Sequence, residues 1–234
     1  ADLAMDEIAV GSRRITDVTG KLNKAYTKDV LYIDELLGKA HQGRLTGFAE
    51  IIIDGPLQYG VNMSVEDVDL NDLLNAGVEN AEDRITIQGK LDATVQLIAE
   101  ADNATNRRAS GVLRVSNGAM GEMPVVLDTM HVVTMELPGN TPFTDGVMSY
   151  RLKGDTLTFE EIDLVGPSLG MVGAGTLDLK TEELDLLFLA GAPPAEGPKL
   201  LGIEEFVQNV AREISEIEVT GTLSEPEMRS VPFR

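Results

Sequence analysis

Apolar and polar side chains alternate along much of this chain. In the clearest run, from Ile85 to Ala99, every second residue from Ile85 onward is apolar or glycine, and those between them are polar as far as Gln96. A period of two is typical of a strand with one face against apolar surroundings. Unbroken, this strand would extend about 50 Å, well beyond the usual strand of about 5–6 residues, and Gly89 is its candidate break.

The same alternation organises the stretch from Gly146 to Phe188 and returns at Ile217–Glu225. Three groups of turn-forming or solvent-favouring residues divide the stretch into successive apolar runs, at Lys153–Asp155, Gly166–Ser168 and Lys180–Glu183. The pattern predicts a meander of antiparallel strands.

The N-terminal part predicts further strands. Residues 1–26 indicate several short ones, and Leu57–Val65 alternates cleanly. The run Val30–Leu37 also fits one face of a helix, but the glycines that soon follow it favour a strand. Asp102–Arg108 has the composition of a polar turn before a strand at Gly111–Gly118.

Two or three short helices are expected among the strands. Asp69 can cap a helix over Asp69–Ala76 that Gly77 would end. Apolar residues at helical spacing predict further helices at 124–137 and 203–214. Because no linker or charge run divides the chain, we expect a single, mainly β domain over residues 1–234.

Composition narrows the classes of function. The formal net charge of −20 argues against a nucleic-acid surface and disfavours anionic membrane surfaces, although a groove for a single lipid need not be basic. Aromatic residues make up only 4% of the chain, which disfavours recognition of sugars or bases by stacking. Cysteine is absent, which excludes disulfides and thiolate chemistry. No apolar run approaches the ~20 residues of a spanning helix. Since the sequence begins without an initiator methionine, we expect an excised segment of a longer protein, with any signal or anchor outside it.

Several short motifs follow one another along nearly the whole chain. They are Ile15–Leu22, Gly43–Gly47, Gly111–Gly118, Asp145-Gly146, Gly166-Pro167, Gly173–Leu179 and Gly221–Pro226. In order and spacing they resemble the C-terminal region of the AsmA family of bacterial envelope proteins, relatives of TamB and of the bridge-like lipid transfer proteins. The similarity rests on order and spacing because each motif is short.

The resemblance implies an elongated, curled antiparallel sheet, a trough often called a β-taco, with an apolar concave face. It also implies a periplasmic location, an inner-membrane anchor in a segment not present here, and transport of phospholipid between inner and outer membranes. The family is not known for a catalytic residue set. We therefore expect no enzymatic activity and no cofactor, with phospholipid or another acyl-chain ligand and other envelope proteins as partners.

An open apolar groove would let acyl chains stay out of water. Its candidate members share the apolar face of the expected strands. They are Tyr59, Val61, Met63, Ile85, Ile87, Leu91, Val95, Leu97, Met148, Tyr150, Leu152, Leu157, Phe159, Leu177, Leu179, Leu184, Leu186 and Phe188. The alternative is that these residues pack as a closed core. The chain would then be a structural or interaction module of the envelope, pairing through its sheet edges without bound lipid.

Other candidate sites are weaker. His41 and His131, the two histidines, lie too far apart in sequence to suggest a metal site, and each is expected to be hydrogen-bonded or solvated. Two acidic clusters, Glu160-Glu161-x-Asp163 and Glu182-Glu183-x-Asp185, have the composition of a Ca²⁺ site. Alternation places adjacent carboxylates on opposite strand faces, and the spacing of a calcium-binding loop is missing, so a metal site is disfavoured. The glycines of Gly170–Gly175 lack the lysine of a phosphate loop and favour bends in a strand. A polysaccharide-degrading enzyme is disfavoured, since aromatics are few and no carboxylate pair can be singled out.

Overall fold

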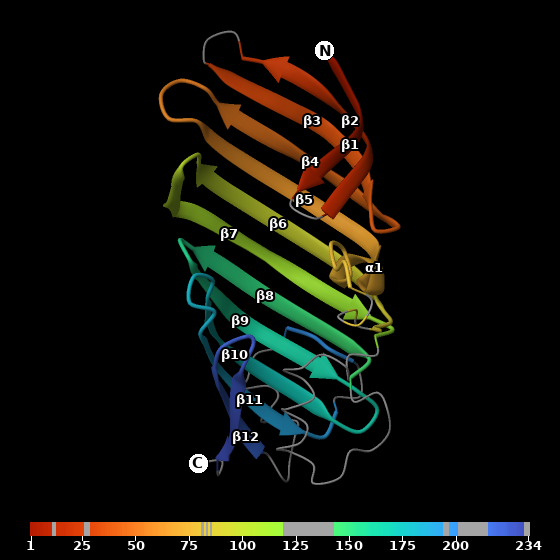
Figure 1. Ribbon diagram of the computed structural model, residues 1–234, viewed down its shortest axis with the longest axis vertical. Helices are drawn as coiled ribbons and strands as arrows, with labels where there is room; N and C mark the ends of the chain where they lie inside the picture. The colour runs from red at the N-terminus through yellow and green to blue at the C-terminus, as the bar shows by residue number, and fades with distance from the viewer. Residues whose placement is uncertain are drawn as a thin grey trace. The chain divides into compact units, whose positions relative to one another are not determined.

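The computed structural model describes residues 1–10, 13–25, 29–80, 82, 84, 86–118, 143–193, 197–200 and 215–231. In these residues the fold is mainly β, as expected: a single antiparallel sheet in which thirteen strands follow one another in chain order, with one short helix (Figure 1). The chain groups into two compact units, which are described separately below. The single-domain expectation stays a prediction.

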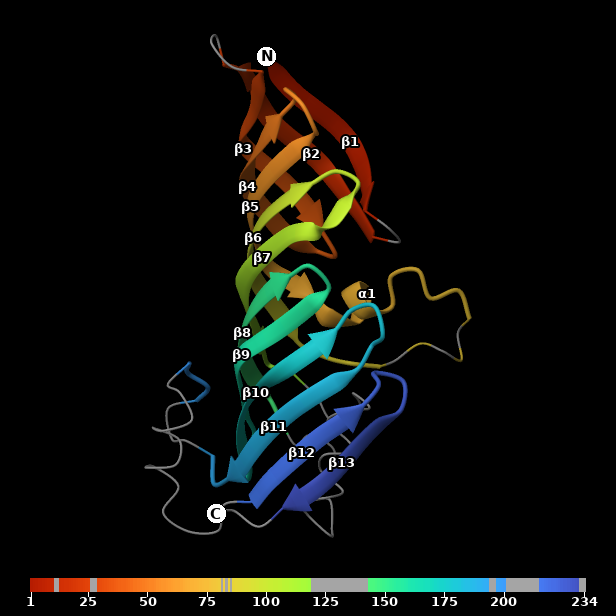
Figure 2. The ribbon, with the colours of Figure 1, turned by 90° about the vertical axis from the view of Figure 1, so that its left-hand side faces the viewer.

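The N-terminal unit contains Ala1–Thr86, Lys90–Leu113 and Leu152–Gly154. Its strands are β1 (Asp2–Val10), β2 (Arg13–Lys24), β3 (Val30–Ala40), β4 (Gly43–Ile52), β5 (Gln58–Asp69), β6 (Lys90–Glu100) and most of β7 (Asn103–Ser116). In Figure 2 its helix, α1 (Leu70–Leu74), lies on the side toward which β1 turns. Strand β3 confirms that Val30–Leu37 is extended, and the described part of residues 1–26 forms two long strands, β1 and β2, in place of several short ones.

The expectation of one strand from Ile85 to Ala99 is wrong, because β6 begins at Lys90. Gly89 has a φ of 134°, a left-handed conformation that strands avoid and glycine tolerates, so the extended run breaks there. The expected turn at Asp102–Arg108 is also too long: the chain turns at Ala101-Asp102, and β7 is extended from Asn103.

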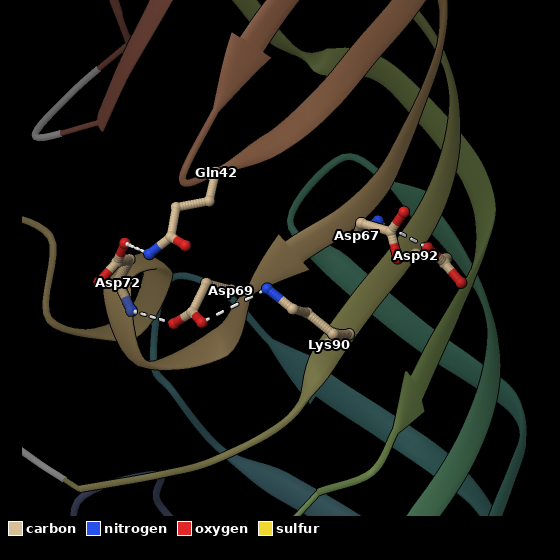
Figure 3. A network of polar contacts seen from close by, with 6 residues as sticks. All are labelled: Gln42, Asp67, Asp69, Asp72, Lys90 and Asp92. Atoms are coloured by element: carbon tan, nitrogen blue, oxygen red, sulfur yellow. Dashed lines mark hydrogen bonds and ion pairs between the residues drawn. The ribbon is translucent and has the colours of Figure 1, made fainter.

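Helix α1 (Leu70–Leu74) confirms the expected short helix and its cap. The Asp69 carboxylate accepts a hydrogen bond of 3.1 Å from the backbone N–H of Asp72, and a salt bridge of 3.5 Å joins the same carboxylate to Lys90. From the β3–β4 turn, Gln42 donates to the Asp72 carboxylate at 2.6 Å (Figure 3). These contacts fix α1 between the β3–β4 turn and the start of β6.

The C-terminal unit contains Ile87–Gly89, Arg114–Arg151 and Asp155–Arg234. Its strands are β8 (Asp145–Lys153), β9 (Thr156–Val165), β10 (Gly170–Asp178), β11 (Leu184–Gly191), β12 (Ser215–Gly221) and β13 (Pro226–Val231). The three expected turns separate β8 to β11. The glycines of β10 lie within the strand, and the register against β9 shifts between Gly173 and Gly175, as bend-forming glycines predict.

A buried apolar cluster fills one face of the C-terminal sheet. Its centre contains Phe143, Met171, Ile217 and Val219, each at most 1% exposed. Phe143 comes from the segment before β8, so the cluster is closed by more than the strands. The helices expected at 124–137 and 203–214 lie outside the described residues.

Candidate functional site

One face of the N-terminal sheet is apolar from strand to strand. Residues that lie directly opposite each other in antiparallel strands share a face. In β5, Val61 lies opposite Ala49 of β4 and Leu97 of β6. The same face continues to β3, where Ile33 lies opposite Ala49, and to β2, where Leu22 lies opposite Ile33. Side chains from five strands thus form one continuous apolar surface.

Most side chains of this apolar face are only half-buried. This holds for the six sequence-derived candidates that β5 and β6 bring together, which are Tyr59, Val61, Met63, Leu91, Val95 and Leu97. On β1, Met5 shares the face through its pairing with Val18 and is 37% exposed. Contiguous apolar patches that water can reach often mark surfaces that bind a ligand or a partner.

The opposite face of the same strands is mostly polar. Beside Leu97 and Val61, the pair Asn62 and Gln96 points to this other side, as do Ser64 and Thr94. Three exposed apolar residues also lie on this side, Ile98 (67% exposed), Phe48 (53%) and Leu37 (48%). The side chains are therefore mostly apolar on one face and mostly polar on the other. An apolar face of this type is what the sequence predicts for the lining of a groove.

In the C-terminal unit, four candidates belong to the closed cluster. Leu177, Leu184, Leu186 and Phe188 are each 5–6% exposed. Met148, Leu157 and Phe159 pack against the cluster and are half-buried. For these residues the closed-core alternative describes the observed packing, and an acyl chain could reach them only if the cluster opened.

The remaining candidates differ from one another in how exposed they are. Ile87 is buried and Leu152 half-buried, while Leu179 lies just after β10 and is 42% exposed. Half-burial raises the pKa of the Tyr150 phenol, which therefore stays neutral at physiological pH. Ile85 lies outside the described residues.

The burial of one carboxylate was not predicted from the sequence. Asp163 of β9 is 5% exposed, and its Oδ2 accepts a hydrogen bond of 2.8 Å from the backbone N–H of Lys199. Its Oδ1 has no hydrogen-bond partner within the described ranges. Burial raises the pKa of Asp163 to about 6, with a smaller contribution from the Glu161 charge, against the lowering effect of the Lys199 N–H.

An acidic, hydroxyl-rich pocket of about 610 Å³ lies in the C-terminal unit and is lined in part by Thr176, Asp178, Asp185 and Thr220. Backbone N–H groups of Thr181 and Lys180 hold the pKa of Asp178 below its usual value. No group of three or more histidine or acidic side chains in the described part of the chain could hold a metal ion. Nor is any helix described there long and apolar enough to cross a membrane.

The geometry thus singles out the apolar face of the N-terminal unit as the main candidate site. Comparison of the chain with protein family models, with curated proteins and with solved structures found no match.

Proposed function

We propose that this chain is a non-enzymatic, lipid-binding segment of a bacterial envelope protein, which holds phospholipid acyl chains as lipid moves between the inner and outer membranes. The observation that carries the proposal is the half-buried apolar face on β2 to β6. The resemblance to the AsmA family supports the setting: the periplasm, with an inner-membrane anchor outside this sequence and other envelope proteins as neighbours.

An acyl chain laid on this face would remove apolar area from water on both sides of the contact. Each square ångström of apolar surface so buried contributes roughly 25 cal/mol. In this proposal the lipid tail lies along the apolar face, out of water, and the headgroup stays in water. The opposite, polar face then accounts for solubility of the segment in the periplasm.

The second candidate function is a structural module that pairs through its sheet edges. The observation that favours it is β1, which pairs with β2 on one side and with no other strand among the described residues. An unpaired edge presents backbone N–H and C=O groups to another strand. This function needs no bound lipid.

Native mass spectrometry with lipid extraction on freshly purified protein separates the two. The lipid-binding proposal expects phospholipid at near one copy per chain. A clean apo mass that is unchanged after incubation with liposomes would overturn it and favour edge pairing.

Neighbouring residues of β6 offer a matched pair of variants. Leu97→Asp places a charge on the apolar face, and Ile98→Asp places the same charge on the exposed polar face. We expect Leu97→Asp to reduce retained lipid at least about tenfold, since a desolvated carboxylate costs several kcal/mol, and Ile98→Asp to leave it unchanged. Circular dichroism of both variants should first show that each one is folded. Equal lipid retention in both folded variants would show that this face does not bind lipid.

A further inference from the structure

A polar pocket of about 500 Å³ lies at one end of the N-terminal sheet, beside α1 and the β3–β4 turn. The residues that line it are Arg14, His41, Asn71, Asp72, Asn75, Ala76 and Arg84. Two guanidinium groups and one carboxylate thus line the pocket, and one of the two, Arg14, is also paired with Glu7 outside it. In a chain with a formal net charge of −20, two arginines at one pocket are a local concentration of basic groups.

Counted against the described residues, both guanidinium groups keep unused N–H donors. Arg14 reaches Glu7 at 3.4 Å, and Arg84 reaches the backbone carbonyl of Val78 through two nitrogens, also at 3.4 Å. These are long contacts, and a guanidinium has five N–H donors in a fork that matches phosphate oxygens. The carboxylate of Asp72 accepts a hydrogen bond of 2.6 Å from Gln42, which orients it while leaving its charge in place.

His41 is held at the pocket by an unusual turn. Both central residues of the β3–β4 turn, His41 and Gln42, have positive φ values of 47° and 68°, where glycine or asparagine is usual. The backbone N–H of Asp69 donates to the His41 carbonyl at 2.9 Å and ties this turn to the cap of α1. The Nε2 atom of His41 is buried without a hydrogen-bond partner among the residues described. A strained residue with an orphaned buried nitrogen is expected where a ligand completes the site.

We infer that this pocket binds a phosphate group, with Arg14 and Arg84 donating to its oxygens and the His41 side chain lining the site. The apolar face ends beside it: Val68 lies opposite Leu91 on that face, and Leu70, also buried, directly precedes Asn71. A phospholipid is the ligand whose chemistry fits both surfaces. That identification of the source rests on the proposed function, whereas the phosphate site itself does not.

Inorganic phosphate, titrated into the whole chain against sodium chloride of equal ionic strength, tests the site. The chain has two histidines, so the imidazole carbon–proton signals in an NMR spectrum report on His41, with His131 as internal reference. We expect a saturable shift of the His41 signal with phosphate. Arg14→Gln and Arg84→Gln should each weaken binding at least about fivefold, as loss of one charged hydrogen bond predicts. Arg13→Gln, a neighbouring arginine that does not line the pocket, should have no effect.

A His41 signal that does not move with phosphate, or that moves equally in the Arg14→Gln, Arg84→Gln and Arg13→Gln variants, overturns the site. Dihexanoyl phosphatidic acid then identifies the source. If it binds at least about tenfold more tightly than inorganic phosphate, and Leu97→Asp removes that gain, the ligand is a lipid headgroup. If it binds no more tightly than phosphate, the headgroup assignment is wrong and the pocket takes a free phosphate. Lipid retention in the native mass spectrum is read separately, so either proposal can fail alone.

Discussion

At the scale of the residue, Asp163 makes stability depend on pH. In the folded protein the pKa of Asp163 is raised from 3.8 to about 6. Between these two pH values the folded state therefore holds a proton that the unfolded chain has released. Stability from this residue is therefore fully present below pH 3.8 and is lost as pH rises through about 6. We predict that Asp163→Asn, which removes the buried charge, stabilises the protein at neutral pH by roughly 1–2 kcal/mol.

Urea unfolding followed by circular dichroism, at neutral pH and below pH 3.8, measures this effect. The two proteins should differ only at neutral pH. Asp178→Asn is a control of opposite sign, because the pKa of Asp178 is lowered by backbone N–H groups, and its removal should destabilise the protein at neutral pH. A loss of stability in Asp163→Asn at neutral pH would show that the charged form is the one the fold favours.

Residue roles that depend on local sequence could be predicted, and those that depend on distant segments could not. Asp69 was predicted to cap α1 because a cap and its helix are adjacent in the chain. Alternation places Asp163 on the face opposite Ile162, where a carboxylate would be solvated. Its burial comes with the segment at Lys199, far along the chain, which no local pattern indicates.

At the scale of the element, alternation predicted strands where side chains alternate and failed where they do not. The first half of β7, from Asn103 to Arg108, is nearly all polar, yet it is extended. A short turn returns the chain beside β6, and backbone pairing then forms the strand without help from an apolar pattern.

Alternation also fails to tell an open apolar face from a closed one. Leu97 of β6 and Leu186 of β11 have the same local pattern, but Leu97 is half-buried and Leu186 is 6% exposed. The difference lies in what packs over each face. The closed cluster around Leu186 includes Phe143, a residue from outside the strands.

The register of the edge strand β1 allows a prediction about proline. Ala1 and Leu22 exchange both backbone hydrogen bonds, at 2.7 Å each, so by alternation the N–H of Leu3 points to β2 and that of Ala4 points outward. Ala4→Pro should change the free energy of unfolding by less than about 1 kcal/mol, because the N–H that it removes is not in the ladder. Leu3→Pro should cost about 1–3 kcal/mol more than Leu3→Ala, which controls for the lost side chain.

Chemical denaturation of the three variants measures these differences. Ala4→Pro also blocks the outer edge, so it would abolish any self-association that depends on edge pairing, as light scattering would show. If Ala4→Pro is the more damaging of the two proline variants, the register of β1 against β2 is shifted by one residue.

At the scale of the whole molecule, net charge sets which membranes the chain can approach. It carries 39 acidic and 19 basic residues. Lysines and arginines on the strands are often paired, as in Arg44 with Glu66 at 2.6 Å and Lys39 with Asp17 at 2.9 Å. The field at a distance is therefore that of a strongly negative protein, even though two arginines line the pocket beside α1.

This field predicts how lipid uptake depends on the donor membrane. Transfer of a fluorescent phospholipid to the protein should be slower from vesicles rich in anionic lipid than from zwitterionic vesicles, since the approaching surfaces repel each other. The screening length falls from about 30 Å at 0.01 M salt to about 8 Å at 0.15 M, so the difference should narrow several-fold across that range. Uptake from zwitterionic vesicles, measured at both salt concentrations, is the control and should change little. Faster uptake from anionic vesicles at low salt would mean that a basic surface, such as the arginine-lined pocket, governs the encounter in place of the net charge.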